Sequence, residues 1–114
     1  MIEETQKAIC RKYGAAYLAS PPNLKVGISR NVGNGVWPIN GLRHPPEGDT
    51  TGWYILAGLE MSSAPDFFLP LHVSHLHRRC PKIQNYLGLA PGWRFLFDET
   101  YEDIWFDEAL LTLD

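Results

Sequence analysis

Large apolar side chains recur at every second position in the stretch 92–98, where Trp93, Phe95 and Phe97 alternate with other residues. A period of two is that of a β-strand with one strongly apolar face. After a polar break, the run 101–106 is rich in the bulky residue types that sheets favour, so we expect it to form a second strand. The C-terminal part of the chain therefore predicts a β-hairpin, which the rest of the fold must accommodate.

The first part of the chain predicts one helix followed by a hairpin. Apolar residues in 2–18 fall at near-helical spacing, with acidic residues in the first turn, as an α-helix prefers. Gly14 either weakens the interior of this helix by about 1 kcal/mol or ends it, so its last residue is left open. The run 24–29 predicts a strand and 36–42 the returning strand, joined across the turn 31–35, which is rich in Gly and Asn.

The second part of the chain fixes the fold class. The unbroken apolar run 53–57 predicts a central strand buried on both faces. We expect the segment 61–70 to leave the sheet and to bring residues 67–69 into the core. Pro81 suits the first turn of a short helix that ends at Gly88. Together these elements indicate an α+β fold: a mainly antiparallel sheet of about five strands, with an N-terminal helix and a short helix before the C-terminal hairpin.

Length and composition favour one domain that spans residues 1–114. A chain of 114 residues with this apolar fraction can bury a core without disulfides. Its N-terminus has acidic residues and no apolar run, so no secretory signal is expected, and no segment approaches the ~20 apolar residues of a membrane span. We therefore expect a cytoplasmic protein in which Cys10 and Cys80 are separate reduced thiols.

Charge is distributed unevenly along the chain. The net charge is only −3, yet no Lys or Arg follows Arg94. The acidic residues that follow it are Asp98, Glu99, Glu102, Asp103, Asp107, Glu108 and Asp114. An acidic end argues against binding to a nucleic-acid backbone and suits a basic partner surface. The alternative is a solvated face that keeps the domain soluble.

The histidines His72, His75 and His77, together with Cys80, form the cluster that comes nearest to a metal site. Imidazole and thiolate are zinc ligands, and three of them plus a water would make a catalytic site. On a helix, however, His77 would point away from the other two histidines, and neither a CxxC nor an HExxH motif is present. We therefore favour a structural explanation, in which some histidines are partly buried, the others face solvent, and Cys80 is a buried thiol rather than a nucleophile.

Two pairs of adjacent carboxylates, Glu102 with Asp103 and Asp107 with Glu108, could suggest acid–base chemistry or cation binding. Neighbouring residues of a strand point to opposite faces, so Glu102 and Asp103 cannot address one ligand without a bulge. Solvated charge explains these pairs better.

Three tryptophans, Trp53, Trp93 and Trp105, fall in expected strands and are most simply core residues. An exposed Trp or Tyr would instead mark an interaction surface. The sequence alone does not decide which aromatic residues are exposed.

Distinctive strings lie between residues 28 and 111, beginning with ISRNVGNG and ending with YEDIWFDEALL. The best anchors are Gly52-Trp53-Tyr54, Pro91-Gly92-Trp93-Arg94-Phe95 and Tyr101-Glu102-Asp103-Ile104-Trp105. In these strings the chain resembles the bacterial family of immunity protein thirty-three (Imm33-like), a relative of small domains of unknown function that carry an acid beside Ser-Gly-Trp. The corresponding string here is Asp49-Thr50-Thr51-Gly52-Trp53, which departs from that hallmark by placing threonine before the glycine.

The resemblance implies a small cytoplasmic antidote of a polymorphic toxin system, which binds a toxin domain delivered by neighbouring bacteria and blocks it. It also implies no enzymatic activity and no cofactor. Our hypothesis is that Glu102, Asp103, Asp107 and Glu108 contribute to the toxin-binding surface, because an acidic rim around aromatic anchors is one way to occlude a basic site.

Two other functions stay open on the sequence alone. The chain is alternatively a generic ligand-binding or scaffold domain, which a concave pocket lined by Trp and His would favour. A metal-dependent enzyme that uses His72, His75 and His77 is the third candidate, which stoichiometric zinc would favour. Self-association into a homodimer, through the acidic hairpin or an unpaired strand edge, is compatible with each of these functions.

Overall fold

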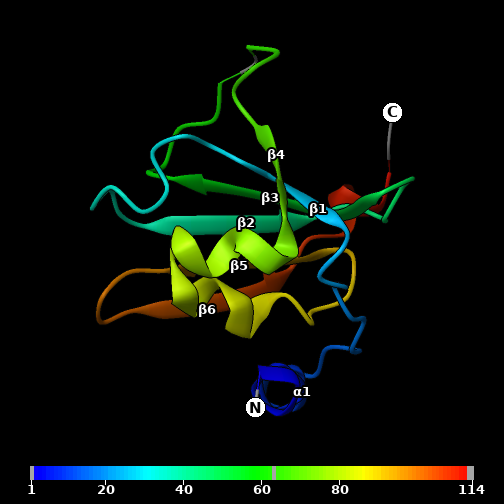
Figure 1. The fold of residues 1–114 in the computed structure, drawn as a ribbon. Helices are drawn as coiled ribbons and strands as arrows, with labels where there is room; N and C mark the ends of the chain where they lie inside the picture. The colour runs from blue at the N-terminus through cyan, green and yellow to red at the C-terminus, as the bar shows by residue number, and fades with distance from the viewer. Residues whose placement is uncertain (1, 63, 113–114) are drawn as a thin grey trace.

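The computed structural model describes residues 2–62 and 64–112. Its strands are β1 (Lys25–Ile28), β2 (Ile39–Arg43), β3 (Thr50–Ala57), β4 (Leu69–His72), β5 (Trp93–Phe97) and β6 (Glu102–Phe106). Its helical elements are α1 (Ile2–Tyr13) and the 3₁₀ turns η1 (Val73–Arg78), η2 (Pro81–Tyr86) and η3 (Glu108–Leu111). Figure 1 shows α1, η1 and η2 as a layer on one side of the strands and the β3–β4 loop (58–62 and 64–68) on the other side.

The strands form one sheet of six in the order β4-β1-β3-β2-β5-β6. Neighbouring strands are antiparallel except β1 and β3, which run parallel. The α+β class and the mainly antiparallel sheet are therefore confirmed, with six strands in place of about five. The additional strand is β4, whose residues alternate between half-buried and exposed and which contains Pro70, a residue that sheets disfavour.

The hairpin expected across the turn 31–35 is wrong, because β3 lies between β1 and β2. The chain after β1 is held by the helical layer instead of reversing beside β1. Arg79 donates from Nε to the carbonyl oxygen of Val32 (3.0 Å) and from Nη2 to those of Ser29 (2.9 Å) and Arg30 (3.0 Å). The composition of the turn therefore indicated local bends correctly but not which strands pair.

The C-terminal hairpin is confirmed, since β5 and β6 are antiparallel neighbours. Phe95 and Phe97 of β5 stack on the ring of Tyr86 in η2, with ring centroids 4.7 and 5.2 Å apart. These two residues therefore face the helical layer, and the alternate residues Arg94 and Leu96 face the other side of the sheet.

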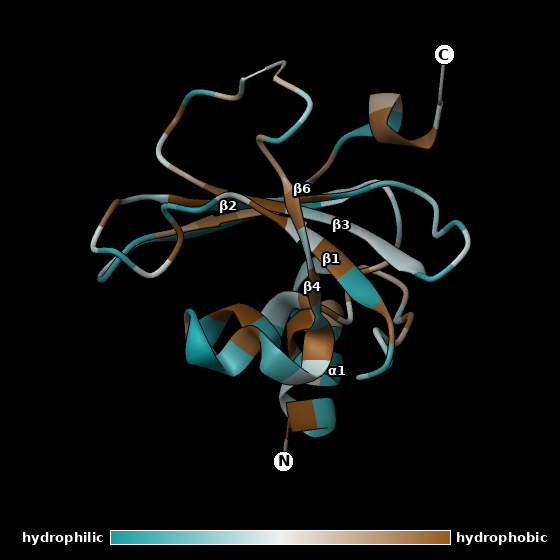
Figure 2. Ribbon diagram, turned by 45° about the horizontal axis from the view of Figure 1, so that its top comes forward, coloured by the Kyte–Doolittle hydropathy of each residue, from teal (hydrophilic) through white to brown (hydrophobic). Residues whose placement is uncertain are grey.

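The helical layer follows the amphipathic pattern of its sequence. In Figure 2 its elements carry both hydrophilic and hydrophobic segments, as expected for elements with one face on the sheet. α1 ends at Tyr13, and Gly14 follows with φ of 75°, so this glycine ends the helix. The short helix expected from Pro81 is the 3₁₀ turn η2. Within the described ranges, no helix has both the length and the apolarity that a membrane span requires.

A buried arginine ties β2 to the helical layer. Arg43 is 1% exposed, and its guanidinium donates to the carbonyl oxygens of Leu18, Ala19, Thr51, Leu87 and Leu89 at 2.8 to 3.3 Å. Burial lowers the pKa of Arg43 to about 10, so the side chain remains charged at neutral pH. Backbone dipoles thus stabilise this charge and join segments that are distant in the chain.

Candidate interaction surface

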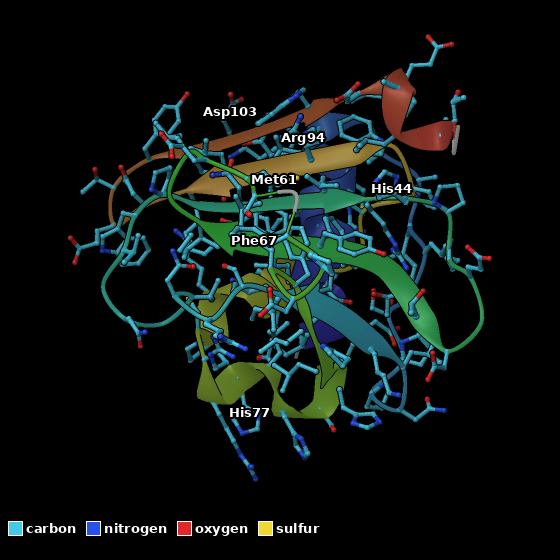
Figure 3. All side chains as sticks on the ribbon, turned by 90° about the horizontal axis from the view of Figure 1, so that it is seen from above. His44, Met61, Phe67, His77, Arg94 and Asp103 are labelled. Atoms are coloured by element: carbon cyan, nitrogen blue, oxygen red, sulfur yellow. The ribbon has the colours of Figure 1, made fainter. Side chains whose placement is uncertain are left out.

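One face of the sheet carries no α1, η1 or η2, and we call it the open face. Its side chains lie in cross-strand rows, of which one contains Gly27, Tyr54, Leu42, Arg94 and Trp105, and the next contains Leu56, Asn40, Leu96 and Asp103. Figure 3 views this face from above, with Arg94 and Asp103 on the two strands at its upper edge and Met61 over the sheet. The open face therefore combines aromatic, apolar and charged side chains.

The three tryptophans expected in the core do not share one environment. Trp53 is a core residue at 1% exposure, and Trp93 is half-buried against the core. Trp105 lies on the open face, where the guanidinium carbon of Arg94 is 5.3 Å from its ring centroid, so its placement in the core is wrong. Arg94 Nη1 is also 3.3 Å from Asp107 Oδ2. Trp105 is therefore a partly exposed aromatic residue of the β5–β6 edge, as is Phe106, which is 48% exposed.

A groove of about 280 Å³ opens between the β3–β4 loop and the strands of the open face. We call it the Met61 groove; its apolar lining consists of Leu42, Pro45, Tyr54, Met61 and Phe68, with His44 beside them. The ring of Phe68 meets Tyr54 edge-on at 5.1 Å, and Phe67 meets Phe68 at 4.8 Å. Residues 67–69 do not enter the core as a unit: Phe67 and Phe68 are half-buried on this face, and only Leu69 begins a strand.

His44 connects the Met61 groove to the C-terminal turn η3. Its Nδ1 lies 3.0 Å from the carbonyl oxygen of Leu110, and its ring meets Tyr54 edge-on at 5.5 Å. Because a carbonyl oxygen only accepts, Nδ1 carries the proton and donates this hydrogen bond. In the tautomer that carries its one proton on Nδ1, Nε2 is an acceptor, and no described residue donates a hydrogen bond to it.

The four acidic residues proposed from the sequence do not converge on one point. Glu102 faces the helical layer, where Tyr13 and Tyr86 donate to its carboxylate, whereas Asp103 is exposed on the open face. Asp107 pairs with Arg94, and its Oδ1 also accepts from the backbone N–H of Ala109 at the start of η3. Glu108 is exposed in the first turn of η3. The structure thus brings Asp107 and Glu108 together at one end of β6, and places Asp103 on the same strand and Glu102 on the opposite face.

The carboxylate of Glu102 is a structural junction. Tyr86 Oη donates to Oε1 at 2.6 Å and Tyr13 Oη to Oε2 at 2.9 Å, while Lys12 Nζ lies 3.7 Å away. Burial alone would raise the pKa of Glu102, but the hydrogen bonds from Tyr86 and Tyr13 and the charge of Lys12 outweigh it and lower the pKa. Burial and the hydrogen bond that Tyr13 donates to Glu102 raise the pKa of Tyr13.

The histidine cluster is dispersed on the surface. His72, His75 and His77 are all exposed, so the partial burial expected of one or two of them is wrong, and His44 is the half-buried histidine instead. The rings of His72 and His75 lie 6.1 Å apart. Among the described residues, no group of three or more His, Cys, Asp or Glu side chains is placed to hold a metal ion. The geometry therefore gives no support to a metal centre at this cluster.

The two cysteines are free thiols, as expected. Cys10 is buried, its thiol donates to the carbonyl oxygen of Gly88 at 3.4 Å, and burial raises its pKa. A protonated thiol is a poor nucleophile. Cys80 is half-buried beside the core and precedes η2. Both positions agree with a structural role.

The string Thr51-Gly52-Trp53 in β3 supports the fold rather than the surface. Gly52 has φ of 90°, and a Cβ there would overlap the carbonyl oxygen of His44. Thr51 is fully buried and donates from Oγ1 to the carbonyl oxygen of Lys25 at 3.0 Å. Trp53 Nε1 donates to the carbonyl oxygen of Leu87 at 3.2 Å. The hydroxyl, the glycine and the indole therefore join β3 to β1, β2 and the segment after η2.

Sequence reasoning missed two parts of the surface. The pairing of Arg94 with Trp105 could have been found from strand alternation. Side chains of neighbouring strand residues point to opposite faces, so Arg94 points away from the face of Phe95, and Trp105 points away from the face of Ile104. The Met61 groove had no comparable signal, since it depends on how the β3–β4 loop folds back over the sheet.

Comparison with known proteins places the chain in a family. The family model of the Imm33-like domain matches residues 5–107, which include every strand described above. No curated protein and no solved structure matches the chain. Because the match covers most of its length, this chain belongs to the Imm33-like domain family.

Proposed function

We propose that this protein is a cytoplasmic immunity protein of a polymorphic toxin system, which binds a cognate toxin domain and blocks it without catalysing a reaction. The observation that carries the proposal is the family match over residues 5–107, because the family name suggests an immunity role. The open face supports it, since the aromatic Trp105 is partly exposed there and the acidic Asp103 is exposed.

The acidic residues of β6 and η3 contribute attraction for a basic toxin surface in this proposal. Asp103 and Glu108 are exposed, and neither forms an ion pair with any described residue. Asp107 contributes less because its carboxylate pairs with Arg94. Glu102 contributes only through the field of its charge, because two tyrosine hydroxyls occupy its oxygens. A complex of this kind gains association rate from charge and affinity from buried aromatic anchors.

The proposal is tested with the products of the open reading frames adjacent to this gene, among which an immunity role requires a toxin domain. We expect co-expression of this chain to restore growth to cells that produce the toxin domain, and calorimetry to show a one-to-one complex of the purified proteins. A folded protein that neither rescues growth nor binds that domain would overturn the proposed function.

Charge reversal tests the assignment of the acidic residues. We expect Asp103→Lys and Glu108→Lys each to weaken the complex by about 1 kcal/mol, because each replaces an attraction with a repulsion. Glu4→Lys is the matched control, since Glu4 is equally exposed but lies on α1 in the helical layer. Affinity that is unchanged by both variants, with the folds intact by circular dichroism, would remove these residues from the interface.

A further inference from the structure

We infer that the Met61 groove receives a single aromatic side chain of the toxin domain, flanked in the toxin by Lys or Arg. This inference rests on the proposed function for the identity of the partner, and on the groove itself for the chemistry of what it binds.

The size and lining of the groove fit one aromatic side chain. Its volume of about 280 Å³ lies just below the ~300 to 1,000 Å³ of pockets that enclose whole small ligands, so it suits an anchor residue better than a cofactor. Tyr54 and Phe68 already meet edge-on, which leaves ring faces and edges for a further aromatic partner. Met61 is 53% exposed at the mouth, and its thioether makes favourable contacts with aromatic rings.

The polar groups at the groove favour a hydrogen-bond donor. His44 Nδ1 faces the carbonyl oxygen of Leu110, and the tautomer that carries its one proton there offers Nε2 as an acceptor. Thr50 Oγ1 donates to the carbonyl oxygen of Glu47 and so offers its own lone pairs. An indole N–H, an ammonium or a guanidinium supplies donors without competing acceptors.

The charge around the groove favours a cation beside the aromatic ring. Glu47 lines the groove, and its carboxylate forms no ion pair within the described part of the chain. Two cations of the neighbouring strands are already paired: Lys25 Nζ lies 2.9 Å from Asp49 Oδ2, and Arg94 Nη1 lies 3.3 Å from Asp107 Oδ2. A Lys or Arg from the toxin therefore meets uncompensated negative charge.

The chemistry of the groove is tested without the toxin by titrating the ¹⁵N-labelled full chain with the capped peptide Lys-Trp-Lys and, as a matched control, with Glu-Trp-Glu. We expect saturable amide shifts at Leu42, His44, Tyr54, Met61 and Phe68, and at least fivefold weaker binding of the acidic peptide. Shifts that lie elsewhere, or equal affinity for the two peptides, would overturn the inference.

The role of the groove in toxin binding is tested with Glu47→Lys and Met61→Lys. We expect each variant to raise the Kd for the toxin domain about tenfold, because each places a positive charge where the cationic segment docks. Ile2→Lys is the matched control, since Ile2 is also an exposed apolar residue, at 46%, but lies on α1 in the helical layer. Equal melting temperatures establish that the variants are folded.

The outcomes separate the two proposals. If the wild-type protein does not bind the toxin domain, the proposed function fails, and the peptide titration still decides the chemistry of the groove. If the wild-type protein binds the toxin domain and Glu47→Lys and Met61→Lys bind it as well as the wild type does, or if Ile2→Lys weakens binding as much as they do, only the inference about the groove is overturned.

Discussion

Glu102 joins three parts of the molecule through one carboxylate. It lies at the start of β6, and the hydroxyls of Tyr13 in α1 and Tyr86 in η2 both donate to it. Because these hydrogen bonds favour the ionised form, the pKa of Glu102 in the folded protein is below its usual value. The carboxylate that the sequence suggested for partner binding is therefore a contact that holds the helical layer on the sheet.

Glu102→Gln should lower the free energy of unfolding by about 1 to 2 kcal/mol at pH 7, since the hydrogen bonds to a charged acceptor are lost. A depressed acid pKa stabilises the fold above the unfolded pKa of about 4.3, and this contribution disappears as the pH falls through the folded value. The difference between wild type and variant should therefore narrow below about pH 4. Urea unfolding at pH 7 and pH 3.5 measures the free energy of unfolding of both proteins, and so the difference between them.

Asp103→Asn is the control for this prediction. Asp103 is the next residue of the same strand, but it is exposed on the open face and has no ion pair with a described residue. Its substitution should change stability by less than about 0.5 kcal/mol. An equal loss in both variants would mean that strand charge, rather than the tyrosine hydrogen bonds, accounts for the effect.

At the scale of elements, β3 depends on a glycine that lets two backbones approach. The amide of His44 donates to the carbonyl oxygen of Gly52 at 2.9 Å, and the carbonyl oxygen of His44 occupies the space of a Cβ at Gly52. His44 is thereby held where β2 ends, with its ring in the Met61 groove. The glycine thus shapes the open face without contributing a side chain to it.

Gly52→Ala should destabilise the protein by about 2 to 4 kcal/mol, because it adds a steric overlap to an unfavourable positive φ. Gly48→Ala separates the two causes: Gly48 also has a positive φ, of 59°, but a Cβ there meets no atom within 4 Å. That control should cost about 1 to 2 kcal/mol. Thermal unfolding of both variants gives the comparison, and equal losses would refute a role for the close approach.

The predictability of each element depends on whether its signal is local. α1 and the β5–β6 hairpin could be predicted because side-chain periodicity is a property of a few neighbouring residues. The insertion of β3 between β1 and β2 could not be predicted from the sequence, because strand pairing depends on contacts between distant segments. The burial of Arg43 also had no sequence signal, since its partners are backbone carbonyl groups from three other segments.

For the candidate surface, the direction of Arg94 and the opposite directions of Glu102 and Asp103 follow from strand alternation. The exposure of Trp105 does not follow from strand alternation, because the sequence does not show which face of the sheet is covered by other elements. The Met61 groove arises from the β3–β4 loop, whose path no periodic pattern specifies.

At the scale of the whole molecule, charge is polarised across the sheet. The helical layer and the turn after η1 carry Lys7, Arg11, Lys12, Arg78, Arg79 and Lys82 against Glu3 and Glu4. The strands, their loops and η3 carry Glu47, Asp49, Glu60, Asp66, Asp98, Glu99, Asp103, Asp107 and Glu108 against Lys25, Arg30, Arg43 and Arg94, whereas Glu102 of β6 faces the helical layer. A small net charge therefore conceals a strong dipole, which orients an approaching basic partner toward the acidic side.

The association rate with the toxin domain should fall by about tenfold or more between 50 and 500 mM NaCl, while the dissociation rate changes little, because salt screens long-range attraction more than close contacts. Stopped-flow fluorescence measures both rates. An association rate independent of salt would show that the dipole does not steer binding.

The order of the strands also bears on when the sheet is completed during synthesis of the chain. β1 acquires its outer neighbour from residues 69–72, and β2 acquires its second neighbour from residues 93–97. A nascent chain on the ribosome has therefore to extend past nearly its whole length before the sheet has its full width. In the proposed role, a chain that stops before residue 93 would lack β5 and β6, and with them Arg94, Asp103 and Trp105 of the open face.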